Sequence, residues 1–126
     1  MPTVTVDDRS VDVPNGTRLT IAIEHAGIDI GHRCGGKARC TTCRVVVLEG
    51  DTTTMTRAEF VRMRDAGLLD SHRLSCQLVV EHDMRVESVM TKQNQGWPDT
   101  GPAIDPDVVP EATWLERSEL EAEQSV

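Results

Sequence analysis

Apolar and polar residues alternate in two short segments at the start of the chain, residues 3–6 (TVTV) and residues 9–13 (RSVDV). A period of two is typical of β-strands with one buried face. Asp7 and Asp8 separate the two segments, and polar residues of this kind favour a turn. The pattern therefore predicts a tight antiparallel hairpin.

The period changes after residues 14–16 (PNG), which predict a turn. Apolar residues then recur three or four positions apart, as on one face of a helix. These residues are Leu19, Ala22, Ile23 and Ala26. Thr17 is placed to cap the first turn, and Gly27 suits the position just beyond the last one. The sequence thus predicts a helix that Thr17 caps and that runs to about Ala26.

The middle of the chain returns to strands around one more helix. Residues 44–49 (RVVVLE) are rich in β-branched side chains and predict a strand. Residues 56–59 (TRAE) form a capping box, which opens a helix of roughly ten residues that Gly67 ends. Leu74, residues 77–80 and residues 84–86 then predict a return to the sheet. This mixed order of strands and helices indicates an α+β fold.

The chain changes character after Gln95. Prolines recur at every fourth position there, namely Pro98, Pro102, Pro106 and Pro110. Residues 93–126 carry eight acidic residues against one arginine, a net charge of −7, whereas residues 1–92 carry a net charge of −1. We therefore expect a folded domain over residues 1–92 and a flexible acidic tail over residues 93–126. Residues 111–124 form at most a short helix with a weak apolar face.

Large apolar side chains are scarce, because Phe60, Trp97 and Trp114 are the only aromatic residues. The core must be aliphatic, so a further source of stability would help the fold. The longest purely apolar run has four residues, and the first eight (MPTVTVDD) do not resemble a signal peptide. We therefore expect a cytoplasmic protein without membrane insertion, whose reduced cysteines bind metal or do chemistry.

Three of the four cysteines lie within ten residues, CGGKARCTTC, and the fourth follows in HRLSCQ. The pattern is C-x5-C-x2-C, then 32 residues, then the last cysteine. A 2Fe-2S cluster needs four thiolates, two for each iron. Gly35 and Gly36 let the backbone approach the sulfurs and direct N–H groups at them. The candidate ligands are Cys34, Cys40, Cys43 and Cys76.

The segments GHRCGGKARCTTCRV and HRLSCQ resemble the cluster loop and the last ligand segment of 2Fe-2S ferredoxins with a β-grasp fold. The resemblance covers approximately residues 3–90, and the order of the predicted elements agrees with it. The x5 spacing is similar to that of the adrenodoxin-like branch. The form CGG-x-x-x-C-TTC is more similar to bacterial 2Fe-2S domains.

This resemblance implies one 2Fe-2S cluster, with Cys34 and Cys40 on one iron and Cys43 and Cys76 on the other. The iron held by Cys34 and Cys40, nearer the surface in such proteins, would be the one that is reduced. The implied fold class is α+β, a β-grasp 2Fe-2S ferredoxin-like domain with a flexible acidic C-terminal extension.

The implied function is that of a soluble one-electron carrier between a ferredoxin reductase and an acceptor oxidoreductase. We expect an electron-transfer protein without enzymatic activity of its own, monomeric and without a nucleic-acid partner. Two alternatives stay open: a cluster-based redox sensor, or a small electron-transfer subunit of a larger oxidoreductase.

Other uses of the cysteines and histidines fit the pattern less well. A structural zinc site typically takes two close ligand pairs, and Cys34 and Cys76 form no such pair. Two disulfides, or a thioredoxin-like CxxC motif, are not expected in a protein of a reducing compartment. Four thiols already complete a ligand set, so a Rieske-type role for histidine is not needed. We expect surface or hydrogen-bonding roles for His25, His32, His72 and His82.

Adrenodoxin-like proteins place an acidic helix where partners dock, but the corresponding residues 57–65 carry Arg57, Arg62 and Arg64 against Glu59 and Asp65. Basic residues also surround the cysteine loop. The basic collar consists of Arg33, Lys37, Arg39 and Arg44. It is either a docking surface or a solvated one, and the acidic tail is an alternative occupant. Positive charges beside an anionic cluster favour its reduced state, so the collar should raise the reduction potential.

Overall fold

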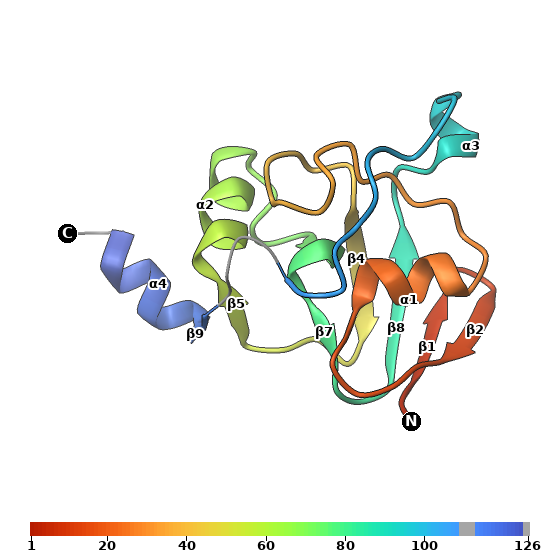
Figure 1. Cartoon of the computed structure of the whole chain (residues 1–126). Helices are drawn as coiled ribbons and strands as arrows, with labels where there is room; N and C mark the ends of the chain where they lie inside the picture. Colours follow the sequence, from red (N-terminus) through yellow and green to blue (C-terminus); the bar gives the residue numbers. More distant parts are fainter. Residues whose placement is uncertain (109–112, 125–126) are drawn as a thin grey trace.

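The computed structural model describes residues 1–108 and 113–124. Its centre is a five-stranded sheet with the strand order β2-β1-β8-β4-β6 (Figure 1). The strands are β1 (Thr3–Val6), β2 (Arg9–Asp12), β4 (Arg44–Glu49), β6 (Arg73–Leu74) and β8 (Met84–Ser88). Within this sheet, only the pairing of β1 with β8 is parallel among the described residues. The predicted hairpin, the predicted strand over residues 44–49 and the α+β class are confirmed.

Helix α1 (Leu19–His25) lies across one face of this sheet (Figure 1). Its apolar side, with Leu19 and Ile23, packs against buried valines of the sheet in an aliphatic core. Thr17 is not the N-cap that the sequence predicted, because it belongs to β3 (Thr17–Arg18), which pairs with β7 (Val79–Val80). The Thr17 hydroxyl donates to the carbonyl of Pro14 at 2.7 Å and closes the turn before the helix.

Helix α2 (Arg57–Asp65) begins at the predicted cap, since the Thr56 hydroxyl accepts from the N–H of Glu59 at 3.1 Å. The Glu59 carboxylate does not complete the capping box. It is fully buried and accepts from the guanidinium of Arg73 and from the N–H of Leu74, each at 2.8 Å. The segment that follows β6 is the 3₁₀ turn η1 (Ser75–Gln77), so Gln77 is not part of a strand as predicted.

The tail residues that the structure describes carry more regular structure than the sequence predicted. Besides helix α3 (Lys92–Gln95), they form strand β9 (Trp114–Glu116), which pairs with β5 (Thr54–Thr56), and helix α4 (Arg117–Gln124). Helix α4 lies within the segment for which the sequence allowed a short helix. Leu120 of α4 is fully buried against Met55 and Phe60. The edge of β5 offers backbone hydrogen-bond partners to β9, and the space beside Phe60 holds the side chain of Leu120. One buried leucine is therefore enough to pack α4 against the domain, although its apolar face is weak. Residues 111–112 of the predicted helix lie outside the described residues.

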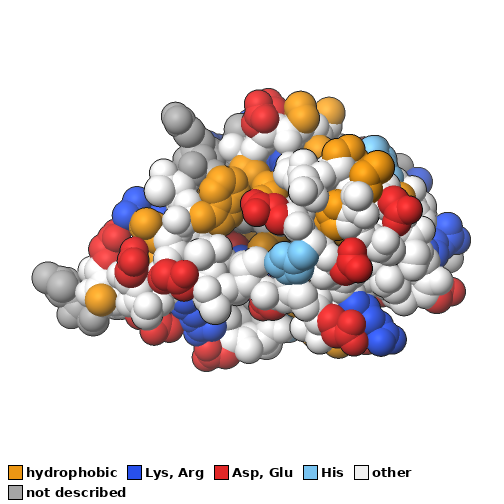
Figure 2. All heavy atoms as spheres, turned by 90° about the horizontal axis from the view of Figure 1, so that it is seen from below, with side chains coloured by type: hydrophobic (Ala, Val, Ile, Leu, Met, Phe, Trp, Pro, Cys, Tyr) orange, Lys and Arg blue, Asp and Glu red, His pale blue; other side chains and the backbone are white. Residues whose placement is uncertain are grey.

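The end of the molecule opposite the cysteine loop exposes both acidic and basic side chains (Figure 2). Figure 2 shows Asp and Glu side chains spread over this end, with hydrophobic side chains gathered around a hollow. A hollow of about 180 Å³ is lined in part by Leu78 and Trp114. Within residues 1–108 and 113–124, no helix is long and apolar enough to span a membrane.

Candidate metal-cluster site

The cysteine loop, residues 34–43, has no regular secondary structure and leads directly into β4 (Figure 1). Three of its residues have a left-handed backbone: Gly35 (φ 73°), Gly36 (φ 80°) and Ala38 (φ 58°). Glycine adopts this conformation at little cost, but alanine does not. The N–H of Ala38 is directed at the sulfur of Cys76, which gives this strained residue a role in the site. No local pattern in the sequence indicates that role.

The structure brings the four predicted cysteines together in two pairs. Cys34 and Cys40 lie beside each other in the loop and Cys43 lies beside Cys76 on η1, close enough for each thiol to shift the pKa of its neighbour. The loop pair is half-buried, whereas Cys43 and Cys76 are 1% and 0% exposed. In the described part of the chain, no three His, Cys, Asp or Glu side chains surround a point where a single metal ion could sit. Two thiol pairs are the protein ligands that a two-iron cluster requires.

Hydrogen-bond donors face the sulfurs of both pairs. The N–H of Lys37 donates to the Cys34 sulfur at 3.3 Å, and the Thr42 hydroxyl lies 3.1 Å from the Cys40 sulfur. The amide of Gln77 donates to the Cys76 sulfur at 3.8 Å. Such donors stabilise negative charge on ligating sulfurs and tune the reduction potential of a cluster. The residues present therefore fit a 2Fe-2S cluster.

Within each pair, the two thiols shift each other's pKa in opposite directions. The hydrogen bond with Cys40 lowers the pKa of Cys34 to about 4, and the same bond raises the pKa of Cys40. In the buried pair, the bond with Cys43 lowers the pKa of Cys76, while the bond and burial raise the pKa of Cys43. A metal that takes all four sulfurs as thiolates must displace the remaining protons.

A buried polar network fixes the backbone on both sides of the Cys43–Cys76 pair. The Ser75 hydroxyl donates to the carbonyl of Cys43 at 2.7 Å and lies 2.6 Å from the Thr20 hydroxyl. The ion pair of Glu59 with Arg73 holds the strand that leads into η1. These bonds keep Cys76 in place even though 32 residues separate it from Cys43.

Residues 97–107, which we call the strap, cover one side of the cysteine loop. The N–H of His32 donates to the carbonyl of Thr100 at 2.8 Å. Gly35 and Gly36 lie so close to Pro102 and Ile104 that a β-carbon on either would be 3.3 or 3.1 Å from these side chains. The two glycines therefore allow the strap to approach, in addition to giving the loop its conformation. The sequence did not predict this contact.

The strap also neutralises one member of the basic collar. Asp99 forms an ion pair with Arg33 at 3.3 Å, and the Arg33 guanidinium lies 5.3 Å from the centroid of the Trp97 ring. The side chains of Lys37 and Arg39 are exposed, and neither has an ion-pair partner among the described residues. These two cations thus remain available beside the half-buried cysteine pair.

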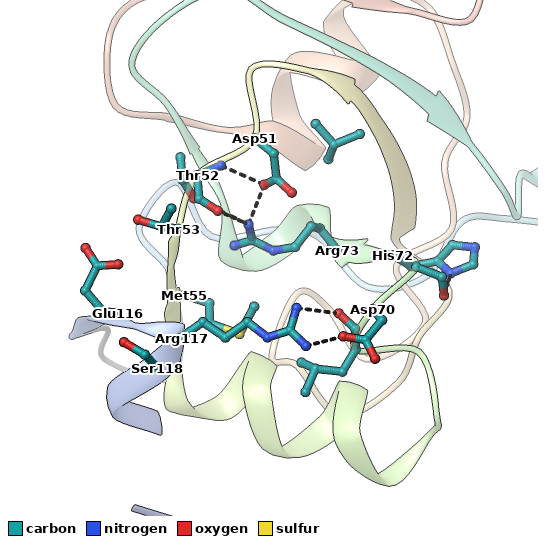
Figure 3. Close-up of a pocket in the computed structure, with 13 residues that line it drawn as sticks. Asp51, Thr52, Thr53, Met55, Asp70, His72, Arg73, Glu116, Arg117 and Ser118 are labelled. Carbon is teal, nitrogen blue, oxygen red and sulfur yellow. Dashed lines mark hydrogen bonds and ion pairs between the residues drawn. The ribbon is translucent and has the colours of Figure 1, made fainter. Parts of the chain in front are cut away.

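A cavity of about 530 Å³ lies away from the cysteines, between β5, residues 69–73 and the start of α4 (Figure 3). The guanidiniums of Arg73 and Arg117 both point into it. Arg73 is paired with Asp51 at 2.6 Å, and Arg117 is paired with Asp70. Carboxylates therefore already neutralise both cations, and none of the four cysteines lines this cavity.

The histidines have surface or polar-contact roles, in line with the expectation. The Nε2 of His32 is buried 3.1 Å from the carboxylate of Glu24, and this carboxylate raises the pKa of His32. His72 bonds to the hydroxyl of Ser71 and His82 to the carbonyl of Gly50, each at 2.6 Å. The fourth, His25, is exposed at the end of α1.

Comparisons with known proteins agree with this geometry. The model of the 2Fe-2S iron-sulfur cluster binding domain family matches residues 3–81. A 2Fe-2S ferredoxin of Haemophilus influenzae is 42% identical over 81 residues, which are 61% of this chain and 72% of the relative. The structure of an ISC-like [2Fe-2S] ferredoxin from Pseudomonas putida has a TM-score of 0.50 and 28% identity, covering 69% of this chain and 91% of the other.

A second group of relatives is much longer than this chain. One of them, a component of the Na(+)-translocating NADH-quinone reductase of Idiomarina loihiensis, is 37% identical over 82 residues, which are 64% of this chain. The match covers 20% of that relative, so the chain corresponds to about a fifth of the length of these proteins.

Proposed function

Since the chain belongs to the family of 2Fe-2S iron-sulfur cluster binding domains, we propose that it carries single electrons on a cluster held by its four cysteines. The ligands in this proposal are Cys34, Cys40, Cys43 and Cys76. The observation that carries it is their arrangement in two thiol pairs, one buried and one half-buried. A bound 2Fe-2S cluster supplies the reversible uptake of one electron.

The two cysteine pairs have different roles in this proposal. The buried pair anchors the cluster in the core, and the half-buried pair brings it within reach of a partner. The N–H of Lys37 and the hydroxyl of Thr42 stabilise the negative charge that arrives with the electron. The strap keeps water away from one side of the loop, so electrons enter and leave on the other side.

The partners in this proposal are a reductase that donates the electron and an oxidoreductase that accepts it. The uncovered side of the loop presents Lys37 and Arg39, so the complementary partner surface is acidic. In this proposal residues 1–92 are the cluster domain and residues 93–126 are an acidic extension, of which the strap covers one side of the cysteine loop. Four cysteines without a disulfide suit a reducing compartment such as the cytoplasm.

The second candidate is the electron-transfer part of a larger oxidoreductase. The 37% identity to a component of the Na(+)-translocating NADH-quinone reductase favours it. In that case the half-buried pair would face another domain or subunit permanently. Cluster chemistry is the same in both candidates, and only the lifetime of the complex differs.

Iron and labile sulfide analysis of the anaerobically purified chain, with electron paramagnetic resonance before and after dithionite, tests the proposal. We expect two irons and two sulfides per chain, as the cluster composition dictates, and a rhombic S = 1/2 signal only after reduction. Bound zinc without sulfide and without a signal would overturn the proposal and leave a metal-stapled binding domain.

A further inference from the structure

Arg18 is a fully buried arginine that lies between the cluster loop and the strap. It follows Thr17 in β3 and is 0% exposed. All five hydrogen bonds of its guanidinium end on backbone carbonyls, which matches the five N–H donors of the group. The acceptors are the carbonyls of Cys76, Gly36, Asp105 and Asp107.

These acceptors belong to three separate segments of the chain. The guanidinium Nε donates to Cys76 on η1 at 3.0 Å, and Nη2 donates to Gly36 in the cysteine loop at 2.7 Å. Nη1 donates to the carbonyls of Asp105 and Asp107 in the strap at 2.7 and 3.0 Å. One side chain thus joins both cysteine-bearing backbones to the segment that covers them.

The charge of Arg18 has no carboxylate partner within the described residues, where the hydrogen bonds of its guanidinium all end on carbonyls. A buried unpaired charge is costly, and buried charges are normally paired. The other buried arginine of the network, Arg73, follows that rule through Glu59. The anionic cluster is the group that would compensate Arg18, because Gly36 and Cys76 both border its site.

We propose that Arg18 is a positioning residue that couples the strap to the reduction potential of the cluster. With the strap in place, the guanidinium stays dry, and its positive charge favours the more negative, reduced state. When the strap is displaced, water reaches the guanidinium and screens its charge, so the potential falls. A partner that moves the strap would thereby make the reduced protein a better electron donor. This inference rests on the proposed cluster.

The first test compares Arg18→Gln and Arg18→Lys in the full-length, cluster-loaded protein. We expect Arg18→Gln to lower the midpoint potential by about 59 mV, a tenfold shift of the one-electron equilibrium. Arg18→Lys keeps the charge but not the planar fork, so it should release the strap and lower the potential less. Hydrogen exchange at the amides of Asp105 and Asp107, and at the His32 amide that donates to Thr100 of the strap, measures the release. Spectroelectrochemistry measures the potential.

A second pair of variants displaces the strap without changing Arg18. Gly101 has φ 124°, and a β-carbon there would collide with the carbonyl oxygen of His32, so Gly101→Ala pushes the strap off the loop. Gly96 also has positive φ but open space around it, which makes Gly96→Ala the matched control. We expect a lower potential in Gly101→Ala and an unchanged one in Gly96→Ala.

The outcomes separate this inference from the proposed function. A wild-type chain that binds no iron and sulfide contradicts the proposed function, and this inference with it. A loaded wild type whose potential is unchanged in Arg18→Gln, or unchanged in Gly101→Ala despite faster exchange of the strap, overturns the coupling alone. If Arg18→Gln does not load, the two glycine variants still decide the question.

Discussion

The two cysteine pairs have the same chemistry but opposite surroundings. Cys43 and Cys76 lie in the core, between backbone segments that are fixed by Ser75 and by the Glu59–Arg73 ion pair. Cys34 and Cys40 lie half-buried in a loop without regular structure, and exposed cations flank them. The buried pair therefore contributes to stability, whereas the half-buried pair provides contact with other molecules. Changes at one pair should affect a different measurement from changes at the other.

The largest effect is expected from breaking the buried pair. In the proposed site the cluster links Cys34 to Cys76, and a cross-link of this span stabilises a fold by roughly 4 kcal/mol through loop closure. Cys76→Ser should lose the cluster and fall to the stability of the wild-type apoprotein in urea unfolding. Cys34→Ser should lose less, because Cys40 and Cys43 could still be joined to Cys76 across nearly the same long span. Equal stabilities of apo and loaded wild type would contradict this prediction.

The next effect concerns the support of the buried pair. Glu59→Gln leaves the buried guanidinium of Arg73 with one carboxylate fewer, and breaking such a pair costs about 3 kcal/mol. Urea unfolding of the loaded protein measures this loss. Glu123→Gln is the control, since the Glu123–Arg57 pair is exposed and its loss should change little. Similar losses in both variants would show that burial does not decide the effect.

A smaller effect is expected from a site remote from both pairs. Leu120→Ala removes the buried side chain that holds α4 on Phe60, which we expect to cost about 2 kcal/mol, the low end for buried leucine. The midpoint potential should stay at the wild-type value. Leu48→Ala, at a leucine that is 46% exposed, is the control for stability. A changed potential in Leu120→Ala would mean that the remote end of the tail also acts on the cluster.

The smallest effect in energy should appear at the half-buried pair, and in kinetics. Lys37→Glu reverses an exposed cation beside Cys34, so the reduced protein should react about tenfold more slowly with ferricyanide at low salt. With the cationic oxidant hexaammineruthenium(III), the rate should instead rise. Stopped-flow traces measure both rates.

Arg85→Glu is the matched control for this kinetic experiment. Arg85 is exposed on β8 and pairs in register with Glu49, at the end of β4 away from the cysteine loop. The Arg85→Glu variant should react with ferricyanide and with hexaammineruthenium(III) at nearly the wild-type rates. Equal changes in the two variants would show that total charge, and not the surface beside Cys34, governs the reaction.

The sequence predicted the elements whose signals are local. The hairpin, the strand over residues 44–49 and the Thr56 cap follow from periods and cap residues within a few positions. The β5–β9 pairing is not local, because Thr54 meets Glu116 across the chain. In α4 a single buried side chain, Leu120, does the packing, so its apolar pattern is faint. Proline spacing and acidity correctly exclude an independent core there, but not docking onto an existing one.

In the site, too, the sequence predicts the local features but not the contacts between distant segments. The cysteines and the loop glycines are recognisable because thiol number, spacing and backbone freedom are properties of the sequence. The partner of Glu59 and the acceptors of Arg18 lie in distant segments, so neither residue shows its role in the sequence. Ala38 is the extreme case, since its contribution is a left-handed backbone that the residue type disfavours.

The parallel pairing of β1 with β8 fixes an order of events during biosynthesis. Val4 of β1 pairs with Met84 of β8, which lies 80 residues later in the chain. The centre of the sheet can therefore form only after β8 has been synthesised. Contacts of such separation form slowly, because a long loop must close first. Until β8 leaves the ribosome, all four thiols remain in an incomplete chain, open to oxidation and to stray metal ions. We therefore expect cluster insertion to follow the pairing of β8, so that the newly made thiols stay exposed until that step.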